Sequence, residues 1–285
     1  MTADLDDFSL LVDLKGPSDL QRRPAYRPCL DASGEQLAEV LAPYHFEEQY
    51  PCGLASCRQP HQRGFLVITL NGIETNIGQV CGKNIFGDEF EIKANLQKKR
   101  AERKFQFEKL QNIRDNKDHY LTRIAELYDR RTGVKWADSS LRELKNTIGR
   151  HTSRKLHKMA TRGETLIEDV REATHEERER HKAMDSATKP LSYVSEKVGD
   201  LLGLGFLNSD PRQVLTNLKD KLHELNAIDV KELNAKKLKI WVDWANDIDR
   251  SFEAIEDSLA EAVKFFSGDN KQLIQKMDAI EARGR

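Results

Sequence analysis

The dipeptide Asn71-Gly72, between the apolar segments FLVITL and IETNIGQV, is the feature that most restricts how this chain can fold. Asn-Gly is the preferred pair for a two-residue type I′ turn, which joins two antiparallel strands. In that register the numbers of paired residues add up to 143, which places Cys81 opposite Gln62 and next to His61. We therefore expect a β-hairpin that brings two distant parts of the chain together.

Four candidate metal ligands lie around this hairpin: Cys52, Cys57, His61 and Cys81. Thiolates and imidazoles suit zinc, and four of them complete its tetrahedral shell. Alternatively, Cys52 and Cys81 are small buried hydrophobic residues and His61 is a surface residue. Since three of the four cysteines and a histidine converge through one hairpin, we favour a Zn²⁺ site. Cys29 is the spare cysteine, either a free thiol or a substitute for one ligand.

A short cysteine-rich loop, a hairpin and a ligand at the start of a helix together resemble the treble-clef type of zinc finger. The resemblance covers residues 52–81 and implies a small zinc-stabilised α+β module with a Cys3His site. Treble clefs usually carry a second ligand on the helix, and this chain has Asn84 at that position. No family is identified for the chain as a whole.

The expected zinc is structural, because four protein ligands leave no open coordination position for a substrate. The sequence orders of zinc deaminases and of H-E-x-x-H metalloproteases are absent. The ion would hold together a module too small to have much core of its own. A metal-dependent hydrolase is the alternative if one coordination position stays open.

The rest of the sequence favours helices. Residues 88–131 contain neither Gly nor Pro, and charged residues make up 33% of the chain against 7% aromatic residues. Apolar residues also recur every three or four positions over 238–266, as in a coiled coil. Further helical patterns cover residues 34–44, 138–161, 164–183, 189–202 and 211–227. The expected fold class is mainly α: a zinc-binding α+β module at 1–90, then an elongated helical bundle or antiparallel coiled coil at 91–285.

Charge is divided along the chain in three blocks. Residues 1–90 carry a net charge of −6, residues 91–165 carry +10 and residues 166–285 carry −5. Within the basic block, four cations recur at every fourth residue, which places them on one face of a helix. The candidate nucleic-acid-binding residues are Arg142, Lys145, Arg150, Arg154, Lys155, Lys158 and Arg162. The alternative is a solvated face, or one packed on the acidic segment 168–180.

These patterns predict a non-enzymatic zinc-finger protein that binds nucleic acid through the basic helical face. The alternative is a protein–protein interaction scaffold, in which the zinc module docks a partner and the heptads of 238–266 form a homo-oligomer. The acidic N-terminus does not resemble a secretory signal, and no apolar run is long enough to cross a membrane. We therefore expect a cytoplasmic protein with no membrane association.

Overall fold

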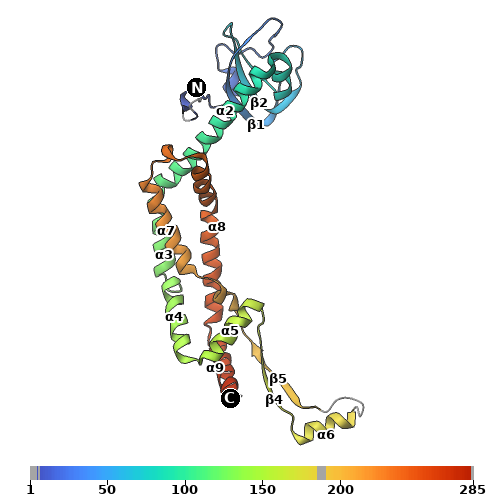
Figure 1. Cartoon of the computed structure of the whole chain (residues 1–285), viewed down its shortest axis with the longest axis vertical. Coiled ribbons are helices and arrows are strands. Elements are labelled where there is room, and N and C mark those ends of the chain that lie inside the picture. The colour runs from blue at the N-terminus through green and yellow to red at the C-terminus, as the bar shows by residue number, and fades with distance from the viewer. Residues whose placement is uncertain (1–4, 6, 185–190, 284–285) are drawn as a thin grey trace. The chain divides into compact units, whose positions relative to one another are not determined.

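The computed structural model describes residue 5, residues 7–184 and residues 191–283. It is mainly helical, with a small antiparallel sheet towards the N-terminus and a helical bundle after it (Figure 1), which confirms the predicted mainly α class with a small β-containing part. The chain divides into two compact units. Unit 1 comprises residues 1–112 and 229–242, and unit 2 comprises residues 113–228 and 243–285.

Unit 1 is built on a three-stranded antiparallel sheet in the order β1-β2-β3. The strands are β1 (Leu37–Pro51), β2 (Pro60–Thr69) and β3 (Glu74–Ile77). Before them come the 3-10 helix η1 (Phe8–Leu10) and the short helix α1 (Pro17–Gln21), and the short 3-10 helix η3 (Val230–Glu232) also belongs to this unit.

The predicted helix over residues 34–44 is wrong, because most of this stretch belongs to β1. Val40, Ala42, Tyr44 and Phe46 are all buried, and this alternation has the two-residue period of a strand. Pro43 does not end a helix. It lies in an edge strand, where the missing N–H of proline is tolerated.

The hairpin at Asn71-Gly72 is present, but its loop is one residue longer than predicted. The Thr69 N–H donates to the Ile73 carbonyl at 2.9 Å, so paired residue numbers add up to 142 rather than 143. Gly72 has a φ of +75°, the left-handed conformation that closes a three-residue loop after a type I turn. Glycine at this position therefore allows the wider loop.

Helix α2 (Gln79–Asp115) carries Cys81 at its start and is kinked at Gly87. There the backbone has φ 62° and ψ −147°, a combination almost restricted to glycine. After the kink, Phe90 packs so closely on Gly82 that an added Cβ would lie 2.3 Å from its ring. The kink therefore sets how the turn that carries Cys81 packs.

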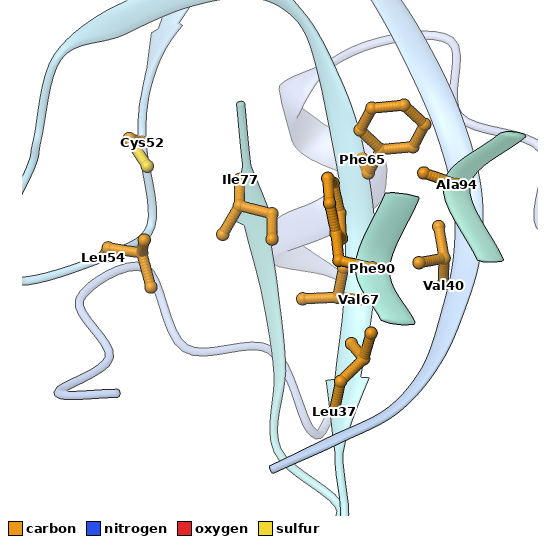
Figure 2. Close-up of a cluster of buried hydrophobic side chains, with 9 residues drawn as sticks. All are labelled: Leu37, Val40, Cys52, Leu54, Phe65, Val67, Ile77, Phe90 and Ala94. Atoms are coloured by element: carbon orange, nitrogen blue, oxygen red, sulfur yellow. The ribbon is translucent and has the colours of Figure 1, made fainter. Parts of the chain in front are cut away.

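Two buried clusters give unit 1 a core of its own, so the expectation of a module with little core is wrong. Phe65 of β2 and Phe90 of α2 meet edge to face, with ring centroids 5.4 Å apart. The first cluster (Figure 2) consists of Leu37, Val40, Cys52, Leu54, Phe65, Val67, Ile77, Phe90 and Ala94. The second consists of Leu20, Tyr26, Tyr44, Phe46 and Leu66. Because neighbouring residues of β2 belong to different clusters, the two clusters lie on opposite faces of the sheet.

Unit 2 is a helical bundle. Its helices include α3 (Lys117–Asp129), α4 (Val134–Thr147), α5 (Arg150–Arg162), α7 (Pro211–Ala227), α9 (Gly268–Arg283), the 3-10 helix η2 (Leu204–Asn208) and most of α8 (Ala235–Phe265). The helix predicted over 138–161 is thus two helices, which meet at Ile148 and Gly149. Among the described residues, no helix is both long enough and apolar enough to cross a membrane.

The apolar stripe predicted over 238–266 is used for packing within the chain. Its buried members are Leu238, Trp241, Ala245, Ile248, Phe252, Ile255, Leu259 and Ala262. At its end Phe265 is buried and Phe266 is half-buried. The side chains that we expected to support a homo-oligomer are therefore already covered in the single chain.

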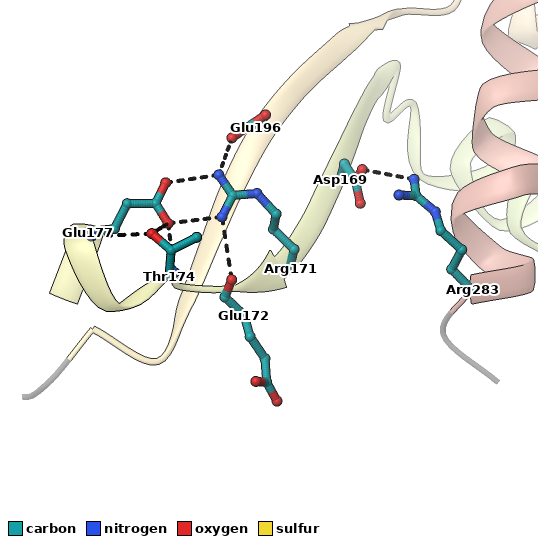
Figure 3. A network of polar contacts seen from close by, with 7 residues as sticks. All are labelled: Asp169, Arg171, Glu172, Thr174, Glu177, Glu196 and Arg283. Atoms are coloured by element: carbon teal, nitrogen blue, oxygen red, sulfur yellow. Dashed lines mark hydrogen bonds and ion pairs between the residues drawn. The ribbon is translucent and has the colours of Figure 1, made fainter.

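The helix predicted over 164–183 is present only from His175 onward. The helix predicted over 189–202 is wrong where the structure describes it, and residues 189 and 190 lie outside the described residues. Unit 2 has instead a two-stranded antiparallel ribbon of β4 (Leu166–Glu172) and β5 (Tyr193–Asp200), and α6 (His175–Met184) follows β4. The Arg171 guanidinium holds the Glu177 carboxylate through two hydrogen bonds of 2.8 and 2.9 Å (Figure 3). It also reaches Glu196 of β5 at 2.6 Å. The Arg171–Glu196 contact joins the two strands across 25 residues of sequence, so no local pattern marks it.

Candidate functional site

Three of the four predicted metal ligands come together in unit 1. The Sγ atoms of Cys52, Cys57 and Cys81 all lie within 4.8 Å of one another, and those of Cys57 and Cys81 are 3.3 Å apart. Zn–S bonds of about 2.3 Å in a tetrahedral site place two sulfur atoms about 3.8 Å apart. The three thiols are therefore spaced so that they could hold one metal ion.

Two segments supply these thiols, the connection between β1 and β2 and the start of α2. Cys52 directly follows β1, Cys57 lies in the turn before β2, and Cys81 is at the start of α2. The turn is tight, because the N–H groups of Cys57 and Arg58 both donate to the Leu54 carbonyl, at 3.1 and 3.2 Å. Its neighbouring strand β3 holds it in place, since the Gly53 N–H donates to the Asn76 carbonyl at 2.7 Å.

The three thiols differ in burial and in acidity. Cys52 is buried, and burial raises the pKa of its thiol. Cys57 is half-buried, and the backbone N–H of Gln59 lowers its pKa. Burial, followed by the hydrogen bond with Cys57, raises the pKa of Cys81 to about 12. Thiolates are the metal-binding form, so Cys57 is the first ligand that becomes available as the pH rises.

His61, the fourth predicted ligand, is not part of this cluster. Its Nε2 atom lies 2.8 Å from the Tyr44 hydroxyl, and its Nδ1 atom lies 3.2 Å from the Gln59 carbonyl. The Tyr44 hydroxyl in turn accepts a hydrogen bond from Asn76 Nδ2 at 3.1 Å, so it donates its proton to His61. Both ring nitrogens of His61 are thus engaged, and Nδ1 carries the proton.

Cys29 also stays outside the cluster. It is an exposed free thiol, and its neighbour Leu30 pairs with Leu54 in an isolated bridge. Among the described residues, the three cysteines are the one group of three or more potential metal ligands that lie close enough to share an ion. The structure therefore supplies a three-sulfur set.

The predicted basic face is divided between α4 and α5. Arg142 and Lys145 are exposed on α4, while Arg150, Arg154, Lys155, Lys158 and Arg162 are on α5. The opposite side of α5 buries Thr152, Leu156, Met159 and Ala160. The helix is thus amphipathic, as the spacing predicts.

Acidic residues of α9 contact residues along one edge of this basic face. The Lys155 ammonium lies 2.6 Å from the Glu281 carboxylate, which also meets His151 at 3.2 Å. Asp278 accepts hydrogen bonds from the Gly149 N–H, at 3.0 Å, and from the Thr152 hydroxyl. Sequence reasoning missed both acids, because they lie about 126 residues away along the chain and no local pattern marks them.

The remaining cations of α5 face solvent. Arg162 makes one long ion pair with Glu164, at 3.7 Å. Within residues 7–184 and 191–283, no carboxylate lies at ion-pair distance from Arg150, Arg154 or Lys158. The acidic segment 168–180 does not cover them. Its Glu177 pairs with Arg171, and its Asp169 pairs with Arg283 at 3.0 Å (Figure 3).

Comparison of the chain with models of protein families, with curated proteins and with solved structures finds no match.

Proposed function

We propose that this is a zinc-containing protein that binds nucleic acid through the exposed basic face of α5. The observation that carries the proposal is the set of three exposed cations, Arg150, Arg154 and Lys158, which recur every four residues without a carboxylate partner among the described residues. Cations left unpaired in a folded domain retain their full attraction for an anionic surface.

A nucleic-acid backbone fits the spacing of this face. Four residues of helix rise by about 6 Å, so the three cations follow a line about 12 Å long. A phosphate backbone presents a continuous row of charges on that scale, and binding releases the counterions condensed on it. The face offers cations and no Phe, Tyr or Trp side chain, which favours contacts with phosphates over contacts with bases.

In the same proposal a zinc ion held by the cysteine cluster has a structural role, although three sulfur ligands leave one coordination position open, which the four predicted ligands would have filled. Cys52, Cys57 and Cys81 are soft ligands of the kind zinc prefers, and they come from two segments of unit 1. An ion held there would connect the β1–β2 turn to the start of α2. Since unit 1 has its own core, the zinc would add stability to a module that is already packed.

Fluorescence anisotropy of labelled single- and double-stranded DNA and RNA tests the proposal. The wild-type protein is compared with Arg150→Glu/Arg154→Glu/Lys158→Glu. The matched control is Arg131→Glu/Lys219→Glu/Lys236→Glu, which makes the same change in net charge at exposed positions outside α5. We expect the α5 variant to lose at least about tenfold in affinity at low salt. The control should lose much less, and equal losses in both would contradict the proposal.

A further inference from the structure

A groove in unit 2 has an apolar floor that no side chain of the described chain fills. It lies between the C-terminal half of α4, α5 and η2, with a volume of about 470 Å³. The floor is formed by Leu141, Leu144, Ile148, Leu156 and Leu207. Of these, Leu156 is buried and the other four are half-buried.

The groove exists because the apolar face of α4 extends further than the bundle that covers it. Val134 and Ala137, in the first half of α4, are buried. Leu141, Leu144 and Ile148 continue the same face at spacings of three and four residues, but they line the groove. A contiguous set of aliphatic side chains left in contact with water is typical of a binding surface.

The rim of the groove is basic. Lys145, Arg154, His157 and Lys158 line it, and no acidic side chain is among its lining residues in the described part of the chain. The ordinary complement of an aliphatic floor with a cationic rim is an amphipathic helix whose apolar side chains are flanked by carboxylates. Nucleic-acid bases fit less well, because the floor offers no aromatic ring for stacking.

We propose that this groove binds an acidic amphipathic helix of a partner protein. Leucine-type side chains spaced at i, i+3 or i+4 and i+7 would enter between α4 and α5, while glutamates beside them would meet Lys145 and Lys158. Because Arg154 and Lys158 belong both to this rim and to the basic face of α5, the helix and nucleic acid would compete for the protein.

The test uses the full chain and a fluorescein-labelled 16-residue helical peptide with leucines at positions 4, 8 and 11 and glutamates beside them. Two matched peptides carry Ser for Leu or Lys for Glu. We expect the acidic leucine peptide to bind and both matched peptides to bind at least about tenfold more weakly. No binding of the first peptide, or equal binding of the serine peptide, would overturn the proposal.

Protein variants locate the site and separate it from nucleic-acid binding. Ile148→Glu, at a half-buried helix end, and Lys145→Glu, on the exposed rim, should each weaken the peptide at least about tenfold. Ile148→Glu should leave DNA affinity within about threefold of the wild type. Arg150→Glu should instead weaken DNA binding and leave peptide affinity within about threefold. Circular dichroism checks that each variant is folded. Unchanged peptide binding in both groove variants would overturn the proposal, as would a wild-type dimer that Ile148→Glu dissociates, because a second copy would then occupy the groove.

Discussion

Cys57 and Cys81 differ in acidity although their sulfur atoms are 3.3 Å apart. The backbone N–H of Gln59 lowers the pKa of Cys57, while burial raises the pKa of Cys81 to about 12. In keeping with this difference, the Cys81 thiol keeps its proton and donates it in a hydrogen bond to the Cys57 sulfur. A metal ion must displace that proton, so metal affinity should rise with pH until the thiols are ionised.

Replacing one cysteine of the cluster should therefore weaken metal binding. We expect Cys57→Ser and Cys81→Ser to lower zinc affinity by at least about tenfold, since even the loss of an outer-shell partner costs that much. Cys29→Ser is the matched control, because Cys29 is exposed and outside the cluster. Competition with a chromophoric chelator measures all three, and equal losses in the control would show that the cluster is not the metal site.

His61→Ala separates the three-sulfur set from a Cys3His site. Because both imidazole nitrogens are engaged by Tyr44 and Gln59, we expect zinc affinity to stay within about twofold of the wild type. The lost hydrogen bonds should lower the free energy of unfolding by about 1–2 kcal/mol. Cobalt substitution gives an independent readout. If His61→Ala shifted the cobalt absorption bands, His61 would be a ligand after all.

The kink in α2 should contribute to the stability of the protein, because only glycine fits its backbone conformation. Gly87→Ala forces a side chain onto a backbone with φ 62° and ψ −147°, which should cost about 1–3 kcal/mol of unfolding free energy. Gly268→Ala is the control, because its φ is not positive and nothing lies within 4 Å of an added Cβ. Urea unfolding measures both. A Gly87→Ala variant as stable as the control would mean that the kink is not required.

The ribbon of β4 and β5 should respond to acid. The hydrogen bonds from Arg171, followed by the Thr174 N–H, lower the pKa of Glu177 to about 2. This carboxylate therefore stabilises the ribbon fully above about pH 4.5, and the stabilisation is lost as the pH falls towards 2. Side-chain carboxyl NMR follows the titration directly. In Arg171→Met the Glu177 pKa should return towards its ordinary value, and an unchanged titration would show that Arg171 does not hold it.

Sequence patterns predicted some elements well and others badly, for physical reasons. The apolar stripe of α8 and the amphipathic α5 repeat over several turns, so local periodicity predicts them. In β1, by contrast, alternation competed with helix-favouring residues, and in β4 and β5 the decisive contacts are between strands, such as Arg171 with Glu196. The three-residue loop that ends at Gly72 shifts the hairpin register by one residue. Two-residue and three-residue loops both suit the sequence Asn71-Gly72, so no local rule could choose between them.

In the candidate sites, too, local patterns predicted some contacts, and contacts between distant residues decided the others. The hairpin predicted correctly that Cys81 approaches Cys52 and Cys57. It did not predict that a buried tyrosine would hold His61, because Tyr44 lies in the stretch expected to be helical. The cations of α5 were predicted from their spacing. Only the fold shows that Lys155 forms an ion pair with Glu281 and that Arg150 is exposed.

At the scale of the whole molecule, a net charge of −1 conceals a central block of +10. Part of that block is neutralised inside the fold, as at Lys155 with Glu281 and at Arg123 with Glu256. The unpaired cations of α5 thus form a local concentration of positive charge in a nearly neutral chain. A chain with a net charge of −1 would bind nucleic acid weakly if binding depended on total charge. Binding through α5 should instead be lost when Arg150, Arg154 and Lys158 are replaced.

The salt dependence of DNA affinity tests this claim most directly. The logarithm of the association constant is measured against the logarithm of the salt concentration for the wild type, the Arg150/Arg154/Lys158→Glu variant and the Arg131/Lys219/Lys236→Glu control. Each phosphate contact contributes about 0.9 to the slope on duplex DNA, so the α5 variant should have a slope shallower by about 3 while the control keeps the wild-type slope. Equal slopes in all three proteins, or no binding by the wild type at low salt, would contradict the account.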